Sequence, residues 1–174
     1  MASSKDKQNC QIIVYTDGAS LGNPGPAGYA ALLRYYCNGK LIAEKIISGG
    51  FSKTTNNRAE LWAVLKGLEA IKKTNIPVIV VSDSKYIVDS INNKWLMKWE
   101  SENWNKRSNA DLWKAILSQI RRFKDISFQW TKGHAQDELN KVVDNIANSV
   151  AHQVKSGDLK AIPDPGFTEI GKIF

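Results

Sequence analysis

The order of apolar segments along the 174-residue chain predicts an α/β fold. Three strand-like runs come first, separated by turn signals, and strand-like and helix-like segments then alternate. Strands joined by short turns predict an antiparallel meander, whereas a strand, a helix and a second strand predict a parallel, right-handed crossover. With 43% hydrophobic and 24% charged residues, the chain fits one globular domain that buries a core.

The meander is indicated by β-branched and aromatic residues that lie between turn signals. The first strand covers residues 12–16 and ends at Asp17-Gly18, before a glycine- and proline-rich turn. The next two strands cover residues 28–36 and 40–51, and the Asn38-Gly39 pair between them is a strong hairpin signal.

The alternating part begins with a helix over residues 57–73. Its apolar positions follow the spacing of one buried helix face, at Leu61, Val64, Leu65, Leu68 and Ile71. A buried strand at 78–81 stops at Ser82-Asp83-Ser84, which caps a helix to about residue 91. Further along the chain, a helix is expected at 111–123, a short strand at 126–131 and a last helix at 141–155.

The chain is expected to have one folded domain, residues 11–155, and two terminal segments. Residues 1–10 are predicted to be flexible. Residues 156–174 are predicted to form a loosely held tail, because glycines and prolines return there.

Net charge and cysteine content indicate what kind of partner and what kind of compartment to expect for the protein. The net charge of +7 and the pI near 9.4 favour a polyanionic partner without choosing between nucleic acid, acidic lipid and no such partner at all. Cys10 and Cys37 have neither CxxC nor zinc-ligand spacing, so two free thiols in a reducing compartment are expected. No run approaches the roughly 18 apolar residues of a membrane span, and we expect a soluble, cytoplasmic protein that does not contact a membrane.

Four acidic residues carry the candidate chemistry. Asp17 and Asp83 stand at the ends of apolar strands, Glu60 in the first turn of a helix, and Asp144 on the last helix. Taken singly, each has an ordinary structural explanation. Asp17 would be a turn former and Asp83 a helix cap. Glu60 would be a carboxylate favoured by the helix dipole, and Asp144 part of a solvated face. Taken together, they could converge at one edge of the sheet, where such a cluster repels itself unless Mg²⁺ or Mn²⁺ neutralises it. Two such ions about 4 Å apart would bracket a phosphodiester.

Three other features admit two interpretations each. His134, in a loop ten positions before Asp144, is either a surface residue or a proton shuttle, whereas His152 is interpreted as structural. The block at residues 54–58 either caps a helix or binds phosphates and base edges. The segment from 92 to 109 interleaves aromatic and basic side chains, and either packs in the core or grips nucleic acid. Those side chains are Trp95, Trp99, Trp104, Lys94, Lys98, Lys106 and Arg107.

Five ordered blocks give the chain a close resemblance to the bacterial type 1 ribonuclease H family, from about residue 12 to about residue 154. They are Tyr15-Thr16-Asp17-Gly18 with the turn at 22–26, the block at 54–61, Ser82-Asp83-Ser84, Lys132-Gly133-His134-Ala135, and Asp144. The resemblance implies a ribonuclease H-like fold, with a five-stranded mixed sheet (three antiparallel strands, two parallel) flanked by helices. It also implies an endonuclease that uses two Mg²⁺ ions to hydrolyse the RNA strand of RNA–DNA hybrids, leaving 5′-phosphate and 3′-hydroxyl ends.

The resemblance assigns roles to individual residues. Asp17, Glu60, Asp83 and Asp144 match the catalytic, metal-binding carboxylates, and His134 matches the loop histidine that assists turnover. Residues that match the family's substrate contacts are Asn23, Asn56 and Asn57 in the hybrid's minor groove, with Thr55 and Asn109 as candidates for a DNA-strand phosphate.

The chain departs from the family at two places. The segment 95–109 matches the family's basic handle but is shorter, and Glu100 and Glu102 dilute its charge. Lys141 stands where relatives often have an acidic residue. We expect the basic residues of this handle to bind phosphates, and Trp95 and Trp99 to pack.

Two other functions remain open, a nuclease of a related fold that acts on DNA and a non-catalytic hybrid-binding module. The retained carboxylates argue against the second, because unneeded clustered charge destabilises a fold. The protein is expected to act as a monomer on RNA–DNA hybrid.

Overall fold

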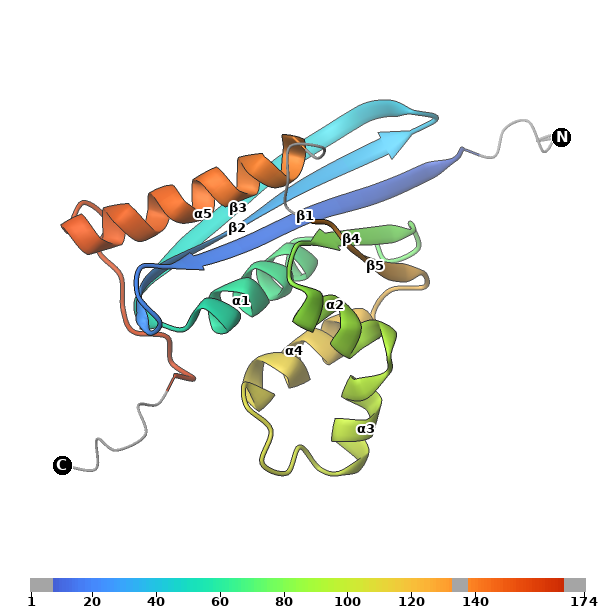
Figure 1. Cartoon of the computed structure of the whole chain (residues 1–174). Helices are drawn as coiled ribbons and strands as arrows, with labels where there is room; N and C mark the ends of the chain where they lie inside the picture. The colour runs from blue at the N-terminus through green and yellow to red at the C-terminus, as the bar shows by residue number, and fades with distance from the viewer. Residues whose placement is uncertain (1–7, 133–137, 168–174) are drawn as a thin grey trace, which may run out of the picture.

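The computed structural model describes residues 8–132 and 138–167. Five strands form one sheet in the order β3-β2-β1-β4-β5, and helices cover both of its faces (Figure 1). The strands are β1 (Cys10–Ser20), β2 (Gly25–Cys37), β3 (Lys40–Thr54), β4 (Val78–Ser82) and β5 (Ile126–Trp130). The helices are α1 (Asn56–Glu69), α2 (Lys85–Asn92), α3 (Trp95–Ser101), α4 (Ala110–Ile120) and α5 (Glu138–Ser156).

The sheet is mixed, as the sequence predicts. β1, β2 and β3 pair antiparallel, while β4 pairs parallel with both β1 and β5. Asn38 and Gly39 turn between β2 and β3 with φ angles of 52° and 79°, the backbone that an Asn-Gly hairpin requires. The predicted fold class and strand pairing are confirmed.

β1 extends further than the apolar pattern indicates. Its parallel pairing with β4 stops at Thr16 opposite Ser82, but its antiparallel pairing with β2 continues to Ser20. Asp17 therefore lies inside a strand at the point where one of its two neighbours ends. Asp83 follows directly after the end of that neighbour.

The core has a layer on each face of the sheet. α1 and α4 pack on one face, where Val14, Leu61, Trp113 and Ile116 are fully buried. α5 covers the other face and buries Val143 and Ala147 against β2 (Figure 1). Among residues 8–132 and 138–167, no helix has both the length and the apolar composition needed to cross a membrane.

The expectation of two free thiols is wrong. Cys10 and Cys37 occupy opposite positions in the β1–β2 pairing and form a disulfide, with their Cα atoms 4.1 Å apart. Their sequence separation of 27 hides this proximity in the sequence. A long antiparallel hairpin brings the first residue of β1 to the last residue of β2.

The predicted loose tail is also wrong for residues up to 167. The Ser52 backbone N–H donates to the Ile162 carbonyl at 2.9 Å, and Asp164 is 2% exposed. The Asp164 carboxylate forms an ion pair of 2.6 Å with Arg58 of α1. This part of the tail is attached to the domain.

Candidate active site

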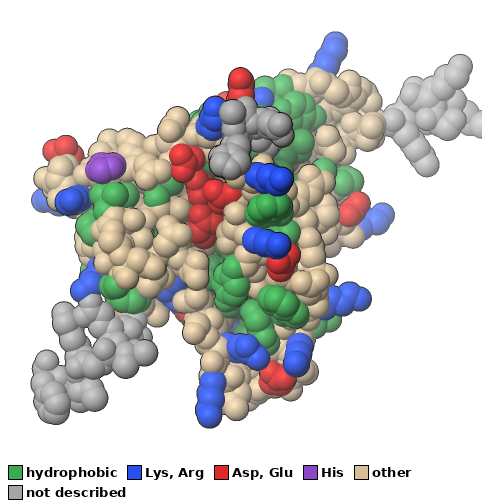
Figure 2. All heavy atoms as spheres, in the orientation of Figure 1, with side chains coloured by type: hydrophobic (Ala, Val, Ile, Leu, Met, Phe, Trp, Pro, Cys, Tyr) green, Lys and Arg blue, Asp and Glu red, His purple; other side chains and the backbone are tan. Residues whose placement is uncertain are grey.

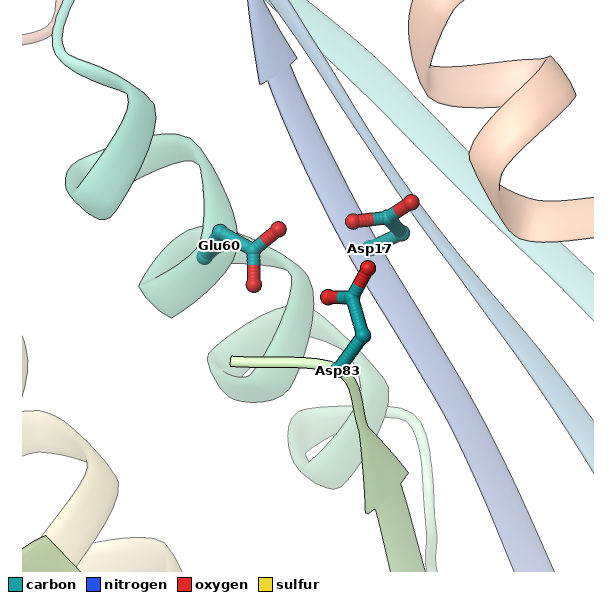
Figure 3. A group of neighbouring side chains, drawn as sticks. All are labelled: Asp17, Glu60 and Asp83. Carbon is teal, nitrogen blue, oxygen red and sulfur yellow. The ribbon is translucent and has the colours of Figure 1, made fainter. Parts of the chain in front are cut away.

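Three of the four predicted carboxylates meet where β4 ends. Asp17, Glu60 and Asp83 each offer an oxygen atom, and these atoms all lie within 4.8 Å of one another (Figure 3). Asp17 and Glu60 are 3% and 7% exposed, and Asp83 is half-buried. Figure 2 shows acidic side chains grouped near the middle of one face, with lysine and arginine side chains around them.

Gly18 allows β1 and α1 to approach so closely. A Cβ atom at this position would lie 2.4 Å from the Glu60 nitrogen, a distance that no side chain tolerates. The Gly18 N–H donates to Asp17 Oδ1 at 2.8 Å and to Glu60 Oε1 at 3.3 Å. One backbone amide therefore orients two of the three carboxylates.

Asp83 is held through its backbone. The Trp130 indole Nε1 donates to the Asp83 carbonyl at 3.0 Å, and the Ser84 N–H donates to Ser82 Oγ at 3.0 Å. Trp130 reaches this carbonyl because it is paired in register with Ser82 across β4 and β5. Sequence reasoning missed Trp130, and only the parallel register could have indicated its role.

The cluster holds protons more tightly than isolated carboxylates do. Burial raises the pKa of Asp17 from its ordinary 3.8 to about 7, and the charge of Asp83 adds to this against a hydrogen bond from Glu60. Burial, and then the hydrogen bond to Asp17, raises the pKa of Glu60 well above its ordinary value. Asp83 also has a raised pKa, from burial and from the charge of Asp144. Burial and the mutual repulsion of these acids thus favour the protonated form within the cluster when no cation is bound.

Asp144 lies at the border of this cluster. It is exposed on α5, its Oδ1 accepts a hydrogen bond of 3.2 Å from Asn148, and it interacts with both Asp17 and Asp83. It is not one of the three acids whose oxygens lie within 4.8 Å of one another. His134 lies outside the described residues, and Lys141 is exposed on α5.

The donor set fits a hard divalent cation. All three converging groups are carboxylates, and neither sulfur nor imidazole is among them. Oxygen ligands of this kind suit Mg²⁺ or Mn²⁺ better than Zn²⁺. A cation would also relieve the repulsion that raises these pKa values.

The predicted substrate contacts gather around a polar pocket of about 700 Å³, beside the first turns of α1 and α4. Its lining includes Asn23, Thr55, Asn57 and Asn109, whereas Asn56 is not part of it. The Asn56 backbone N–H donates to Asn23 Oδ1 at 3.0 Å. Arg58, from the predicted block at 54–58, also lines the pocket, as do Gly166 and Phe167, which sequence reasoning missed.

The handle is a surface segment that stacking and ion-pair contacts hold against the domain. Trp99 is 7% exposed and packs as predicted, but Trp95 is 41% exposed, so the prediction that it packs in the core is wrong. Arg107 stacks on the Trp99 ring at 4.9 Å. Arg121 binds both carboxylate oxygens of Glu100 at 2.6 and 2.7 Å. The Glu100 charge is thus paired with α4, and it dilutes the handle less than the sequence suggests.

The chain is similar to known proteins over most of its length. The family model named RNase H matches residues 9–152. The chain belongs to the RNase H family. Ribonuclease H of Syntrophus aciditrophicus (strain SB) is 42% identical over 170 residues, which cover 95% of this chain and 91% of that protein. Ribonuclease H of Haemophilus influenzae (strain 86-028NP) is 39% identical over 164 residues, covering 91% and 97%.

Solved structures of RNase H proteins have the same fold. LC9-RNase H1, a type 1 RNase H with the type 2 active-site motif, is similar with a TM-score of 0.71 and 28% identity, covering 82% of this chain and 72% of that one. LC11-RNase H1 in complex with RNA/DNA hybrid is similar with a TM-score of 0.62 and 25% identity, covering 83% of this chain and 99% of that one. The expected RNase H family, fold and enzyme class are confirmed.

Proposed function

We propose that this RNase H-family protein hydrolyses the RNA strand of RNA–DNA hybrids at the site formed by Asp17, Glu60 and Asp83. The observation that carries the proposal is the convergence of three carboxylates from β1, α1 and the residue after β4, within 4.8 Å and with raised pKa values. The similarity to LC11-RNase H1, which was solved with an RNA/DNA hybrid, supports the choice of substrate.

Two divalent ions at this site would supply a water molecule of lowered pKa and would stabilise the leaving oxygen. The residues of the chain hold and orient the reacting groups. Asp17, Glu60 and Asp83 would hold the ions as carboxylates, and the Gly18 N–H keeps the first two in place. We assign Asp144 the fourth carboxylate position, because it already interacts with Asp17 and Asp83 across the gap to α5. His134 is assigned proton transfer during turnover.

The pocket beside α1 suits a phosphate of the DNA strand, because three of its side-chain acceptor atoms are already used. Thr55 Oγ1 accepts from the Arg58 backbone N–H at 3.2 Å, and Asn109 Oδ1 accepts from Arg58 Nη1 at 3.4 Å. Asn23 Oδ1 accepts from the Asn56 N–H. The hydroxyl of Thr55 and the amide nitrogens of Asn23 and Asn109 remain as donors. A pocket with donors of this kind recognises an anion.

The handle supplies a second contact with the backbone of the hybrid. A hollow of about 470 Å³ is formed by α3, the segment before α4 and Tyr86 of α2. Three basic side chains and two tryptophans are among its lining residues, Lys98, Lys106, Arg107, Trp95 and Trp99. Exposed Trp95 offers an aromatic surface beside those charges. We assign this hollow to the DNA strand, since phosphate contacts position the duplex without reading its sequence.

The test is a cleavage assay with four end-labelled substrates. RNA is supplied as hybrid, as single strand and as RNA duplex, and the fourth substrate is the corresponding DNA duplex. We expect cleavage of the hybrid alone, stopped by excess chelator, restored by Mg²⁺, and giving 5′-phosphate and 3′-hydroxyl ends. Asp17→Asn and Glu60→Gln should abolish cleavage, and the exposed control Asp125→Asn should retain it. Cleavage of the DNA duplex, or activity in excess chelator, would contradict the proposal.

Metal binding is tested separately from activity. Calorimetric titration with Mg²⁺ or Mn²⁺ in the absence of substrate should show binding to the wild-type protein and to Asp125→Asn. The same titration should show much weaker binding to Asp83→Asn, which loses one of the three converging carboxylates. Equal binding to all three proteins would place the metal elsewhere.

A further inference from the structure

A C-terminal strap, residues 161–167, returns from α5 to the first turn of α1 (Figure 1). It pairs with the edge strand β3, where the Ser52 N–H donates to the Ile162 carbonyl at 2.9 Å and the Asp164 N–H donates to the Lys53 carbonyl at 3.3 Å. Pro163 and Pro165 flank Asp164 and restrict its backbone. The strap therefore delivers one carboxylate to a fixed place.

Asp164 is the most fully bonded acid among the described residues. Its Oδ2 atom accepts from Thr54 Oγ1 at 2.7 Å, from Arg58 Nε at 2.6 Å and from Trp62 Nε1 at 3.0 Å. Its Oδ1 atom accepts from Arg58 Nη2 at 3.1 Å and from the Gly166 N–H at 3.0 Å. Burial alone would raise the pKa of Asp164, but the hydrogen bonds, that from Arg58 first among them, hold it below its ordinary value.

Arg58 connects the strap to the start of α4. Its two Nη atoms bind the Asp111 carboxylate at 2.8 and 2.7 Å, and Nη1 also reaches Asn109 Oδ1 at 3.4 Å. The guanidinium is 3% exposed and is held on both sides by a carboxylate. Its direction is therefore set by Asp164 as much as by Asp111.

The strap also forms part of the pocket wall. A Cβ atom on Gly166 would lie 2.0 Å from Asp111 Oδ2 and 2.3 Å from Arg58 Nη2, so the backbone of the strap rests directly on this ion pair. Gly166 and Phe167 line the same pocket of about 700 Å³ as Thr55 and Asn109.

We infer that the C-terminal strap is a positioning element of the substrate-binding surface: through Arg58 it orients the Asn109 amide toward a phosphate, and with Gly166 and Phe167 it bounds the pocket. The inference rests on the proposed function, which provides the phosphate. It gives a role in binding to a segment that lies beyond residue 152, where the match to the family ends. Asp164 does not touch the substrate in this account and acts through Arg58.

The test measures the dissociation constant of a labelled RNA–DNA hybrid in excess chelator, so that binding is read without cleavage. Asp164→Asn removes the charge that fixes Arg58, and we expect the dissociation constant to rise about three- to tenfold, the effect of one lost hydrogen bond. In cleavage assays with Mg²⁺, KM should rise more than kcat falls. The matched control is Asp158→Asn, an exposed acid of the same tail, which should bind as the wild type does.

A double variant separates positioning from a general loss of stability. Asn109→Ala should weaken binding by a similar factor, and Asp164→Asn should add little to it, because both changes remove the same contact. Multiplied effects in the double variant, or unchanged binding in folded Asp164→Asn, would overturn the inference. If Asp164→Asn does not fold, Gly166→Ala displaces the strap while keeping the carboxylate, and the same two outcomes apply. Failure of the wild-type protein to bind hybrid would instead refute the proposed function.

Discussion

The substitution Asp17→Asn should make the protein more stable at pH 8 when no divalent cation is present. Asp17 is 3% exposed and its pKa is raised from 3.8 to about 7, chiefly by burial. Because the folded state holds this proton more tightly than the unfolded state, the stabilisation is complete below about pH 4 and is lost as the pH rises toward 7. At about 1.4 kcal/mol per pK unit, a shift of about three units amounts to roughly 4 kcal/mol.

Asparagine avoids that loss while keeping the local geometry. Its side-chain oxygen can still accept the Gly18 N–H, which lies 2.8 Å from Asp17 Oδ1, and it carries no charge beside Glu60 and Asp83. In excess chelator at pH 8, we expect a gain of about 2 to 4 kcal/mol over the wild type, or about 4 to 16 °C in melting temperature. At pH 4 the difference should be small, because Asp17 is then protonated.

Thermal or urea unfolding at pH 4 and pH 8, in chelator and in Mg²⁺, measures this effect. The exposed acid Asp125, changed to asparagine, is the control and should show no comparable dependence on pH. In excess Mg²⁺ the advantage of Asp17→Asn should shrink or reverse, since a ligand that binds only the folded wild type stabilises it. An equal gain at both pH values would refute the argument, because the gain would then come from packing and not from charge.

Three further changes test other parts of the structure. Gly18→Ala should reduce hybrid cleavage at least 100-fold, because the added methyl would lie 2.4 Å from the backbone at the start of α1 and would move two carboxylates apart. Trp130→Phe removes the indole donor to the Asp83 carbonyl, and calorimetry should show Mg²⁺ affinity falling about three- to tenfold. Reduction of the Cys10–Cys37 disulfide should lower the unfolding free energy by about 3 kcal/mol in urea titrations, given the 27-residue separation. Cleavage should be unaffected by this reduction, because Cys10 and Asp17 are seven positions apart along β1, or about 23 Å.

Features set by local sequence could be predicted. The Asn38-Gly39 turn and the apolar face of α1 depend on residues within one or two turns of the chain, and both are found where expected. The ends of elements were less accurate, since pairing with β2 extends β1 beyond Asp17 and α1 ends at Glu69 instead of residue 73. Contacts between distant segments carry no local signal. The disulfide, the role of Trp130 and the attachment of the strap are all of that kind.

Two charged residues near the start of α1, one in its first turn and one just after it, show how far sequence reasoning could have gone. Arg58 and Glu60 are spaced from Leu61, Leu65 and Val64 so that both lie on the apolar face, and both are buried, at 3% and 7% exposure. A buried charge requires a partner, so the helical spacing alone implies that each must find one elsewhere in the fold.

The two charges meet that requirement differently. Arg58 is neutralised within the chain by Asp111 and Asp164. Glu60 faces Asp17 instead (Figure 3), and no lysine or arginine within residues 8–132 and 138–167 forms an ion pair with it. Its compensation has to come from a proton or from a bound cation. Since a proton held there would be released when a cation binds, Mg²⁺ binding near neutral pH should be accompanied by proton release. Calorimetry in buffers of different ionisation enthalpy would detect that release, and its absence would show that Glu60 is already ionised before the cation arrives.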